Sequence, residues 1–397
     1  MKQFRYRGVL LLLSVLLALM TGLMLYASSI KLNPPLTNAT IDYAAFTPDS
    51  QHIIYRIKYR DDKSAAIYRV PVMGGESVQL STRDLDTWFT KPSQFIASIS
   101  PDGAYVLYRS NQDEAEVLEL FSVPTNGVVS DSVKLNSNLV TGGNVAQDNF
   151  TYVQISPTSD RAAYIADQEI DEKNELYSVP IAGPASAGVK LNAPLLLEED
   201  VTKFQFTPDG QYVVYLVESG SVDTIYAVPS AGPATAAVNL TAALGIGGNL
   251  SNFKITPDSK NLLFSRVESS SGSTNLYKTP LSGATDPVMV TTRTIYKYDI
   301  SPDGNFVVFS SLPSDRFIPE LYRVPFATSP VGEIKLNHDM VADGMVLQFA
   351  ITPDSSRVVY HASDTASQTF GLFVASLDGL DPIIKLNDFP IVSWGTY

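Results

Sequence analysis

The residues best suited to hold a metal ion are three acidic side chains that alternate along one short stretch. These are Asp167, Glu169 and Asp171, each separated from the next by one residue. Calcium takes about six to eight oxygen ligands, and alternating carboxylates are how a calcium-binding loop begins. The stretch lacks the turn glycine and a clear bidentate closing position of such a loop. Calcium is therefore the one cofactor that the sequence suggests, and solvated surface charge is the competing interpretation.

A partner site is suggested by acidic side chains that gather in neighbouring loops. These candidates are Asp113, Glu114, Glu116, Asp171 and Glu172. An earlier loop of the same kind is basic instead, with Arg56, Lys58, Arg60 and Lys63. An acidic sector beside a basic one would steer a basic or dipolar partner toward this face. The alternative is loop charge that keeps an acidic protein soluble.

Four apolar residues in expected loops are candidate anchors for a partner. They are Trp88, Phe89, Phe317 and Ile318. Large apolar side chains on loops are either buried beneath their own loop or exposed as contact points for another molecule. Both interpretations stay open. If these side chains are exposed contact points, the partner would be a protein or a small ligand.

Catalytic groups are sparse in this sequence. His338 and His361 follow expected strands and, with a nearby aspartate, could bind a metal or exchange protons. The chain has no Gly-x-Ser-x-Gly motif, so the hydrolase interpretation lacks its nucleophile. Glycine pairs at 142–143 and 247–248 are not followed by the lysine of a phosphate-binding loop. We therefore assign no catalytic residue.

Residues 1–29 differ from the remainder of the chain. Three basic residues precede an uncharged, leucine-rich run of 18 residues at 9–26. This length lies between a long signal-peptide core and a short membrane-spanning helix. We expect one N-terminal apolar helix, either cleaved as a signal peptide or retained as an anchor. The protein would then be exported to the cell envelope or beyond, with this segment as its membrane contact.

The charge of the exported part narrows the choice of partner. The whole chain carries −13, and the leader contributes +3, so the remainder carries −16. Such an acidic surface argues against nucleic acid and against docking on anionic lipid. The chain has no cysteine, which excludes disulfides and thiolate metal sites.

The elements that must position these loops are set by a repeat of Ser/Thr-Pro followed in most copies by Asp-Gly or Asp-Ser. Its seven prolines are Pro48, Pro101, Pro157, Pro208, Pro257, Pro302 and Pro353, and an aromatic residue follows each one seven positions later. Apolar residues alternate before each proline, which is the period of a strand. Proline and the turn residues end that strand, so each copy predicts a hairpin.

Two more strands complete each repeat. A second aromatic residue begins a segment that usually ends in Val-Pro, and a short apolar-Lys-Leu-Asn segment or a weaker version of it follows. Four strands per period of about 50 residues predict an all-β, seven-bladed β-propeller of four-stranded antiparallel blades. We place it at 30–397, with blades beginning near 41, 94, 150, 201, 251, 295 and 346. Residues 30–35 resemble the end of a repeat, and we expect this segment to lock the ring against the last blade. The competing interpretation is that residues 30–40 are only a linker inherited with the repeat.

The motif resembles the TolB-type, WD-repeat-like β-propeller repeat from about Phe46 to Asn387. That resemblance implies the fold but not the function, because such blades occur in periplasmic scaffolds, peptidases and polysaccharide lyases. Our prediction is an exported, membrane-tethered, monomeric binding scaffold without enzymatic activity. The alternative is a propeller enzyme of the lyase or hydrolase type with its site at the central channel.

Overall fold

The computed structural model describes residues 31–33, 37–85, 97–145, 152–220, 222–245, 248–268, 271–312, 319–339, 344–363 and 370–387. These residues form seven antiparallel sheets of four strands, called blades one to seven in chain order, and the first sheet has one additional strand. The predicted seven-bladed, all-β fold is therefore confirmed. The apolar segment at 1–29 lies outside the described residues. Within them, no helix has the length and apolar character needed to cross a membrane.

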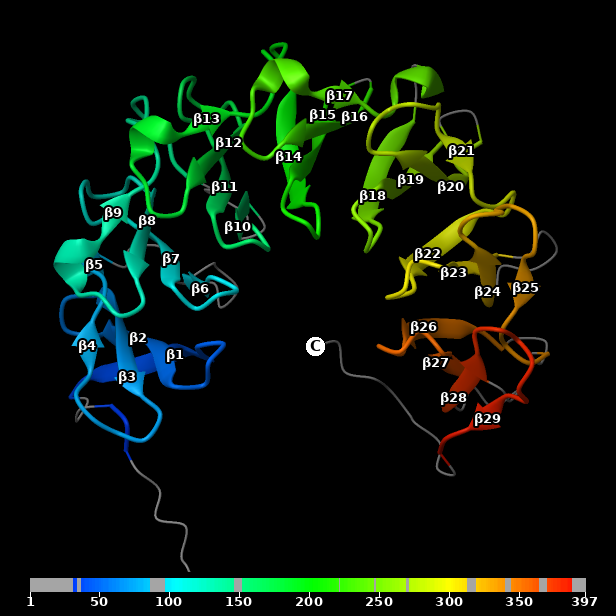
Figure 1. Ribbon diagram of the computed structural model, residues 1–397, viewed down its shortest axis with the longest axis horizontal. Helices are drawn as coiled ribbons and strands as arrows, with labels where there is room; N and C mark the ends of the chain where they lie inside the picture. Colours follow the sequence, from blue (N-terminus) through cyan, green and yellow to red (C-terminus); the bar gives the residue numbers. More distant parts are fainter. Residues whose placement is uncertain are drawn as a thin grey trace, which may run out of the picture.

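Each blade runs from an inner first strand to an outer fourth strand (Figure 1). Blade one contains β1 (Ala39–Phe46), β2 (His52–Tyr59), β3 (Ser64–Pro71) and β4 (Val78–Gln79), with β5 (Asp84–Leu85) paired to β3. Blade two contains β6 (Ala97–Ile99), β7 (Tyr105–Ser110), β8 (Glu119–Pro124) and β9 (Val133–Lys134). Blade three contains β10 (Val153–Ile155), β11 (Arg161–Ala166), β12 (Glu175–Pro180) and β13 (Val189–Lys190).

The remaining blades have the same order of strands. Blade four contains β14 (Asp200–Phe206), β15 (Tyr212–Glu218), β16 (Thr224–Pro229) and β17 (Val238–Asn239). Blade five contains β18 (Asn249–Ile255), β19 (Asn261–Val267), β20 (Thr274–Pro280) and β21 (Val288–Met289). Blade six contains β22 (Ile295–Ile300), β23 (Phe306–Ser311), β24 (Glu320–Pro325) and β25 (Ile334–Lys335). Blade seven contains β26 (Val346–Ile351), β27 (Arg357–Ser363), β28 (Phe370–Ser376) and β29 (Ile384–Lys385).

The proline-marked turn is closed by a hydroxyl and a carboxylate from the motif itself. In blade six, the Ser301 hydroxyl donates to Asp303 and accepts the backbone N–H of Phe306 at 2.9 Å. The Asp303 carboxylate also accepts the backbone N–H of Asn305 at 3.0 Å. Ser or Thr before the proline and Asp after it are therefore needed together, because each satisfies a polar group that the turn leaves unpaired.

The seven turns lie on one rim and contact one another in sequence. Three neighbouring pairs are joined by hydrogen bonds from Asp102 N to Ser159 Oγ (3.0 Å), Asp209 N to Ser259 Oγ (3.0 Å) and Asp303 N to Ser355 Oγ (2.9 Å). The other three pairs pack through a glycine, with Gly103 against Pro48, Gly210 against Thr158 and Gly304 against Pro257. This common rim is the arrangement that the repeat predicts.

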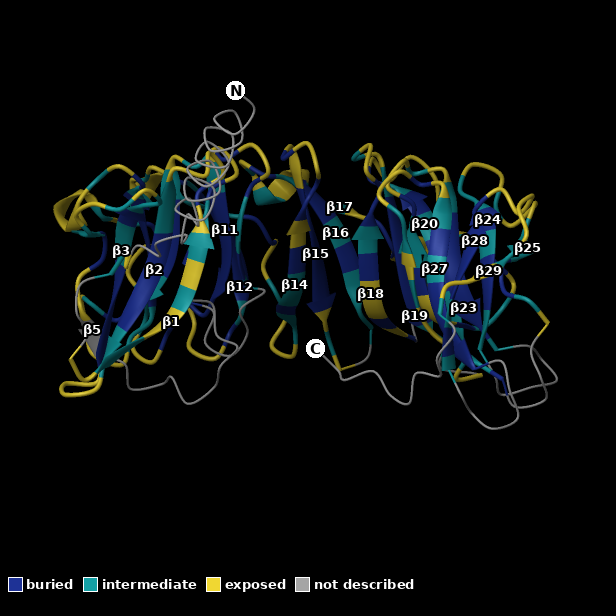
Figure 2. Ribbon diagram, turned by 90° about the horizontal axis from the view of Figure 1, so that it is seen from below, coloured by how far each residue is buried: buried dark blue, intermediate teal, exposed yellow. Residues whose placement is uncertain are grey.

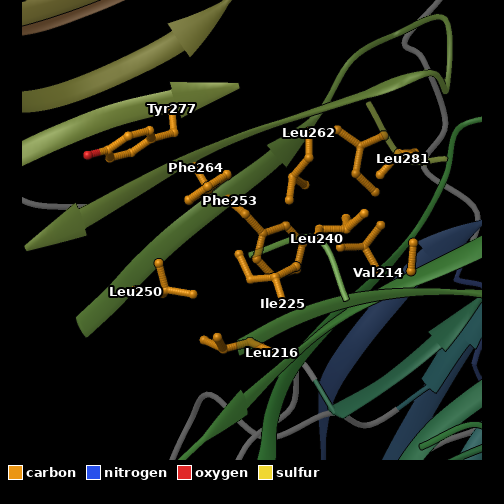
Figure 3. Close-up of a cluster of buried hydrophobic side chains, with 12 residues drawn as sticks. Val214, Leu216, Ile225, Leu240, Leu250, Phe253, Leu262, Phe264, Tyr277 and Leu281 are labelled. Atoms are coloured by element: carbon orange, nitrogen blue, oxygen red, sulfur yellow. The ribbon is translucent and has the colours of Figure 1, made fainter. Parts of the chain in front are cut away.

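The repeated aromatic residues stack in pairs across the second and third strands. Ring centroids lie 5.2–5.9 Å apart in Tyr55–Tyr68, Tyr108–Phe121, Tyr164–Tyr177, Tyr215–Tyr226, Phe264–Tyr277, Phe309–Tyr322 and Tyr360–Phe373. All of these pairs except Tyr55–Tyr68 belong to the apolar clusters that hold adjacent blades together. Figure 3 shows the cluster between blades four and five, which includes Ile225, Leu240, Phe253 and Phe264.

The blades follow an arc in which blade one and blade seven lie apart (Figure 1). Buried apolar clusters join all six neighbouring pairs of blades. In the described part of the chain, no such cluster joins blade seven to blade one. The consequence is visible at Leu386 after β29, which is 50% exposed, whereas Leu135 and Leu191 at the same place in blades two and three are fully buried.

Leu32 packs on blade one rather than on the last blade. It contacts the cluster formed by Tyr55, Ile57 and Val70, and its carbonyl accepts a 3.4 Å hydrogen bond from the Ser77 hydroxyl. The expectation that this segment locks the ring against blade seven is therefore wrong for the described residues. The physical reason is that the Tyr55 face has no preceding blade to cover it.

The turn aspartates predict a loss of stability in acid. The hydroxyl of Thr47, Ser100 or Thr352 lowers the pKa of Asp49, Asp102 or Asp354, and the last falls to about 2 from 3.8. A carboxyl whose pKa is lowered by folding stabilises the protein above its unfolded pKa, and that contribution is lost as the pH falls through the folded pKa. We expect the melting temperature to fall steadily between about pH 5 and pH 2.

Circular dichroism melts at a series of pH values test this expectation, and the same series on Asp354→Asn is the comparison. The variant is expected to melt lower than the parent near neutral pH and to lose less on acidification. A melting temperature that stays constant from about pH 5 to pH 3 would contradict the assignment.

Candidate functional site

The loops after the second and fourth strands lie together on the rim opposite the proline turns, which is the lower rim in Figure 2. Backbone hydrogen bonds connect those of blades two and three. Val140 N, after β9, donates to Gln168 O, after β11, at 3.1 Å, and within blade two Val145 N donates to Leu118 O at 2.8 Å. The acidic loops are thus held side by side on one face, as the strand order predicts.

A cavity of about 320 Å³ lies within these loops of blade two. Its walls are Glu114, Val117, Glu119, Lys134 and residues 138–142. The Asp171 carboxylate of blade three packs against Gly142 in this wall. A Cβ atom added to Gly142 would lie only 2.6 Å from Asp171 Oδ1. The volume is at the lower end of the roughly 300–1,000 Å³ of small-ligand pockets. Two carboxylates of blade two therefore line the cavity, and Asp171 of blade three packs against Gly142 in its wall.

Glu119 and Lys134 form the ion pair at the base of this cavity. Glu119 begins β8 and is 5% exposed, while Lys134 ends the adjacent β9. Lys134 Nζ lies 2.7 Å from Glu119 Oε1 and 3.6 Å from Asp113 Oδ2. Burial would lower the pKa of Lys134, but its bond to Glu119 and the charges of Glu119 and Asp113 raise it. The ammonium group is therefore kept charged.

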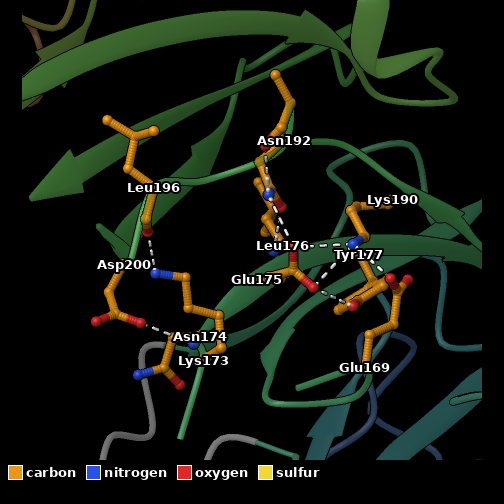
Figure 4. A network of polar contacts seen from close by, with 11 residues as sticks. Glu169, Lys173, Asn174, Glu175, Leu176, Tyr177, Lys190, Asn192, Leu196 and Asp200 are labelled. Atoms are coloured by element: carbon orange, nitrogen blue, oxygen red, sulfur yellow. Dashed lines mark hydrogen bonds and ion pairs between the residues drawn. The ribbon is translucent and has the colours of Figure 1, made fainter. Parts of the chain in front are cut away.

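Blade three has the equivalent glutamate–lysine pair, Glu175 and Lys190, and both oxygens of its carboxylate accept hydrogen bonds (Figure 4). Lys190 Nζ lies 2.8 Å from both carboxylate oxygens of Glu175, and the Tyr177 hydroxyl donates to Glu175 Oε2 at 3.0 Å. Burial and then the charge of Glu175 raise the pKa of Tyr177, so its hydroxyl stays protonated and donates. Blade six repeats this bond, with 2.6 Å from the Tyr322 hydroxyl to Glu320 Oε2.

Blade two lacks that hydroxyl because Phe121 stands where the other two blades have tyrosine. Glu119 Oε1 accepts from Lys134 and, at 3.5 Å, from Asn136. Glu119 Oε2 is buried and accepts no hydrogen bond. A buried carboxylate oxygen without a donor costs about 1–3 kcal/mol or more. One carboxylate oxygen of Glu119 is therefore enclosed by the protein and without a donor.

The three calcium candidates are directed to different partners. Asp167 is buried and accepts the backbone N–H of Asn144 at 2.5 Å, and Glu169 pairs with Lys190 at 2.7 Å. Asp171 lies against Gly142 instead. Among the residues that the structure describes, no group of three acidic or histidine side chains is placed to hold a metal. The structure does not bring the predicted calcium ligands together.

The other predicted partner residues fall into two groups. Asp113, Glu114, Glu116 and Glu172 are exposed on the loop rim, as expected of residues that meet a partner. The four apolar anchor candidates, Trp88, Phe89, Phe317 and Ile318, lie outside the described residues. The acidic part of the predicted surface is thus placed on one face.

Exposed leucines beside this acidic face were not among the predicted anchors. Leu196 and Leu197 are 71% and 89% exposed. Their carbonyls accept hydrogen bonds from the buried Lys173 Nζ, so the loop is held in place while both side chains point outward (Figure 4 shows the Leu196 bond). The three consecutive leucines at 195–197, in a stretch with no strand pattern, were the available signal.

The two histidines considered for catalysis face opposite sides of blade seven. His338 Nδ1 lies 3.3 Å from the Tyr360 hydroxyl. His361 is the next residue in the same strand as Tyr360 and contacts the Phe370 ring with centroids 4.9 Å apart. Successive strand residues point to opposite faces, so these two imidazoles do not share a site.

The fold and this rim define a β-propeller with an acidic, cavity-bearing loop face. The family model of the dipeptidyl peptidase IV (DPP IV) N-terminal region matches residues 26–224, which is half of the sequence, and the chain belongs to this family. The earlier resemblance to TolB-type repeats holds at the level of the propeller fold. No curated protein matches the sequence.

The solved structure of one peptidase supports the same fold. Dipeptidyl peptidase 4 of Porphyromonas gingivalis superposes with a TM-score of 0.59 at 12% identity, covering 90% of this chain and 53% of that one. This chain thus spans about half the length of that peptidase. A prolyl endopeptidase structure is 12% identical, with a TM-score of 0.45 over 88% of this chain and 49% of its own. A putative TolB from Agrobacterium tumefaciens is 14% identical, with a TM-score of 0.35 over 64% and 81%.

Proposed function

We propose that this chain is an exported β-propeller that binds a basic peptide or protein segment on its acidic loop face without catalysing a reaction. The observation that carries the proposal is the acidic character of this rim, where Glu114 and Glu119 line the cavity and Asp171 packs against Gly142 in its wall. Lys134 is the one basic residue in the cavity wall, so the carboxylates outnumber the cations there. Such a face attracts cations and speeds their association.

Location in the cell envelope is part of this proposal and rests on residues 1–29. Three basic residues followed by an apolar run favour export with the positive flank left in the cytoplasm. In that setting the propeller would act as a scaffold on the outer side of the membrane, either released or tethered by this segment.

Binding of a lysine-rich peptide, acetylated at its N-terminus and amidated at its C-terminus, tests the proposed surface. We expect affinity to fall at least tenfold in the double variant Glu114→Lys/Glu116→Lys and to fall with added salt, because both residues are exposed on the loop rim. The matched control is Asp286→Lys, an exposed carboxylate in the loop after the third strand on the opposite rim. Equal affinity in the parent and the double variant would contradict the proposal.

Family membership favours a second function, the propeller portion of a peptidase. A propeller enzyme with a site at the central channel is the related alternative. The propeller-enzyme alternative would be supported if the purified chain hydrolysed chromogenic dipeptide amides or degraded polysaccharide. We expect no turnover by the chain alone, with the lysine-rich peptide bound but intact.

A further inference from the structure

Three apolar positions of each blade pack against the blade that follows it. They are the residues just before the two stacked aromatic residues and the leucine or valine after the fourth strand, for example Ile54, Ile67 and Leu80 in blade one. In blades one to six, every residue at these positions is at most 4% exposed. This face is therefore buried wherever a following blade is present.

In blade seven the same three positions are uncovered. Val359 and Leu372 are partly exposed, and Leu386 is 50% exposed. They point away from blade six, because Tyr360 and Phe373, the next residues of the same strands, pack on that blade. Leu386 and Leu372 are direct neighbours, since Leu386 N donates to Leu372 O at 2.7 Å. The three side chains form one apolar surface, which is more stable when another element covers it.

A cavity of about 150 Å³ lies on this uncovered face. Its lining residues are Gln348, Phe349, Ala350, Val359, Tyr360, His361 and Leu372. Most of the lining comes from two rows of paired residues across the sheet, which are Gln348–His361–Leu372 and Ala350–Val359. A cavity of roughly this volume between apolar side chains holds one benzene ring. There is therefore room for one aromatic side chain.

An aromatic residue packs on the equivalent face in four of the six interfaces between blades. It comes from the first strand of the following blade, four positions before the repeated proline, as Phe204, Phe253, Tyr298 and Phe349. Blade one has Ala44 at this position, so closure of the ring by blade one would bring only a methyl group to the cavity. A different segment is needed to supply the ring.

The residues that follow blade seven are suited to this place. Residues 388–397 come directly after the blade, lie outside the described residues and carry one charge, at Asp388. Their large apolar side chains are Phe389, Ile391, Val392, Trp394 and Tyr397. The cavity lies within three strand spacings of Leu386, about 14 Å. A chain of this length spans up to about 33 Å when extended, so it is long enough to cross the face.

The other end of the arc shows such a cover. Leu32, which precedes blade one, packs on Tyr55, Ile57 and Val70, and these three residues are at most 2% exposed. They belong to the face of blade one that no preceding blade covers in the described part of the chain. A segment outside the blades thus covers one open face, and the sequence offers a second segment for the other.

We propose that residues 388–397 fold back over blade seven, cover Val359, Leu372 and Leu386, and place one aromatic ring in the cavity. The end units of a stacked repeat need such a cap because they lack a neighbour on one side. A single segment covers less of the sheet than a whole blade does, so blade seven remains the most weakly held unit. The cap involves blade seven alone and is independent of the acidic face on blades two and three.

A single introduced thiol tests the cap, because the chain has no cysteine of its own. In the full chain, Leu386→Cys is expected to react with a thiol reagent about tenfold more slowly than Leu380→Cys. Leu380 is the matched control, since it belongs to the same blade and is 84% exposed. Adding Phe389→Ser/Ile391→Ser/Trp394→Ser is expected to remove the protection of Leu386→Cys, because the segment loses most of its apolar surface. The same three changes are expected to leave Leu380→Cys as reactive as before.

Tryptophan fluorescence gives a second measurement that leaves blade seven unchanged. Trp88→Phe makes Trp394 the only tryptophan of the chain. We expect acrylamide to quench Trp394 roughly twofold less in the folded protein than in urea, because the cap holds the large indole ring against the sheet.

Three outcomes would overturn the cap. The first is a Leu386→Cys thiol as reactive as that of Leu380→Cys, and the second is equal quenching of Trp394 in the folded and unfolded protein. The third is protection of Leu386→Cys that survives the three serine substitutions, which would mean that another element covers blade seven. Sedimentation at two protein concentrations then distinguishes a second copy of the chain from blade one of the same chain.

Discussion

Replacing Phe264 by alanine is expected to destabilise the protein by about 3–5 kcal/mol, the range for removing a fully buried phenylalanine. Phe264 has no exposed surface, stacks on Tyr277 with ring centroids 5.6 Å apart, and lies in the cluster between blades four and five (Figure 3). Its loss removes apolar contact from both blades at once and leaves a cavity between them.

Urea unfolding followed by circular dichroism measures this effect as a shift of the midpoint at unchanged slope. The matched control is Tyr296→Ala, an aromatic residue of blade six that is 72% exposed, for which a change within about 0.5 kcal/mol is expected. A loss below about 1 kcal/mol for Phe264→Ala would show that this interface does not hold the two blades together.

Replacing Lys190 by methionine is expected to cost up to about 3 kcal/mol, the lower end of the range for breaking a buried ion pair. Lys190 contacts both oxygens of Glu175, whose side chain is 5% exposed. The variant leaves that carboxylate with the Tyr177 hydroxyl and a long contact to Asn192. The cost stays moderate because these donors remain and because the Lys190 side chain is 26% exposed.

Lys385→Met is the comparison for this measurement. Lys385 occupies the same place in β29 of blade seven, where Gly371 stands in the position of the glutamate. Gly371 supplies no buried carboxylate at this place, so Lys385→Met is expected to cost less in urea unfolding than Lys190→Met. Equal losses in the two variants would mean that Lys190 acts through its aliphatic chain rather than through its charge.

Much of the fold follows from the spacing of a few residue types. Proline ends the first strand, the flanking hydroxyl and carboxylate close the turn, and the aromatic residue seven positions later fixes which face of the second strand is buried. These are local rules, and each copy obeys them independently, so seven copies predict seven blades. The contacts between successive turns, such as Asp303 to Ser355, follow from stacking those copies.

The arc was not predictable in the same way. The apolar pattern of blade seven is the same as that of an inner blade, and only its neighbours decide whether Leu386 is buried. The pocket of blade two was hidden for a different reason. Phenylalanine and tyrosine are equivalent in a strand pattern, and the missing hydroxyl of Phe121 matters only because Glu119 and Lys134 converge beside it.

In the part of the chain that the structure describes, each inner blade packs against two neighbours, whereas blade seven packs against blade six only. In such a one-dimensional stack the stability of a unit depends on how many neighbours it has, so thermal fraying starts at the terminal unit. Local unfolding is therefore expected to begin at blade seven, where Leu386 is half exposed, and to proceed from blade to blade. The acidic loops of blades two and three lie several blades away from that end.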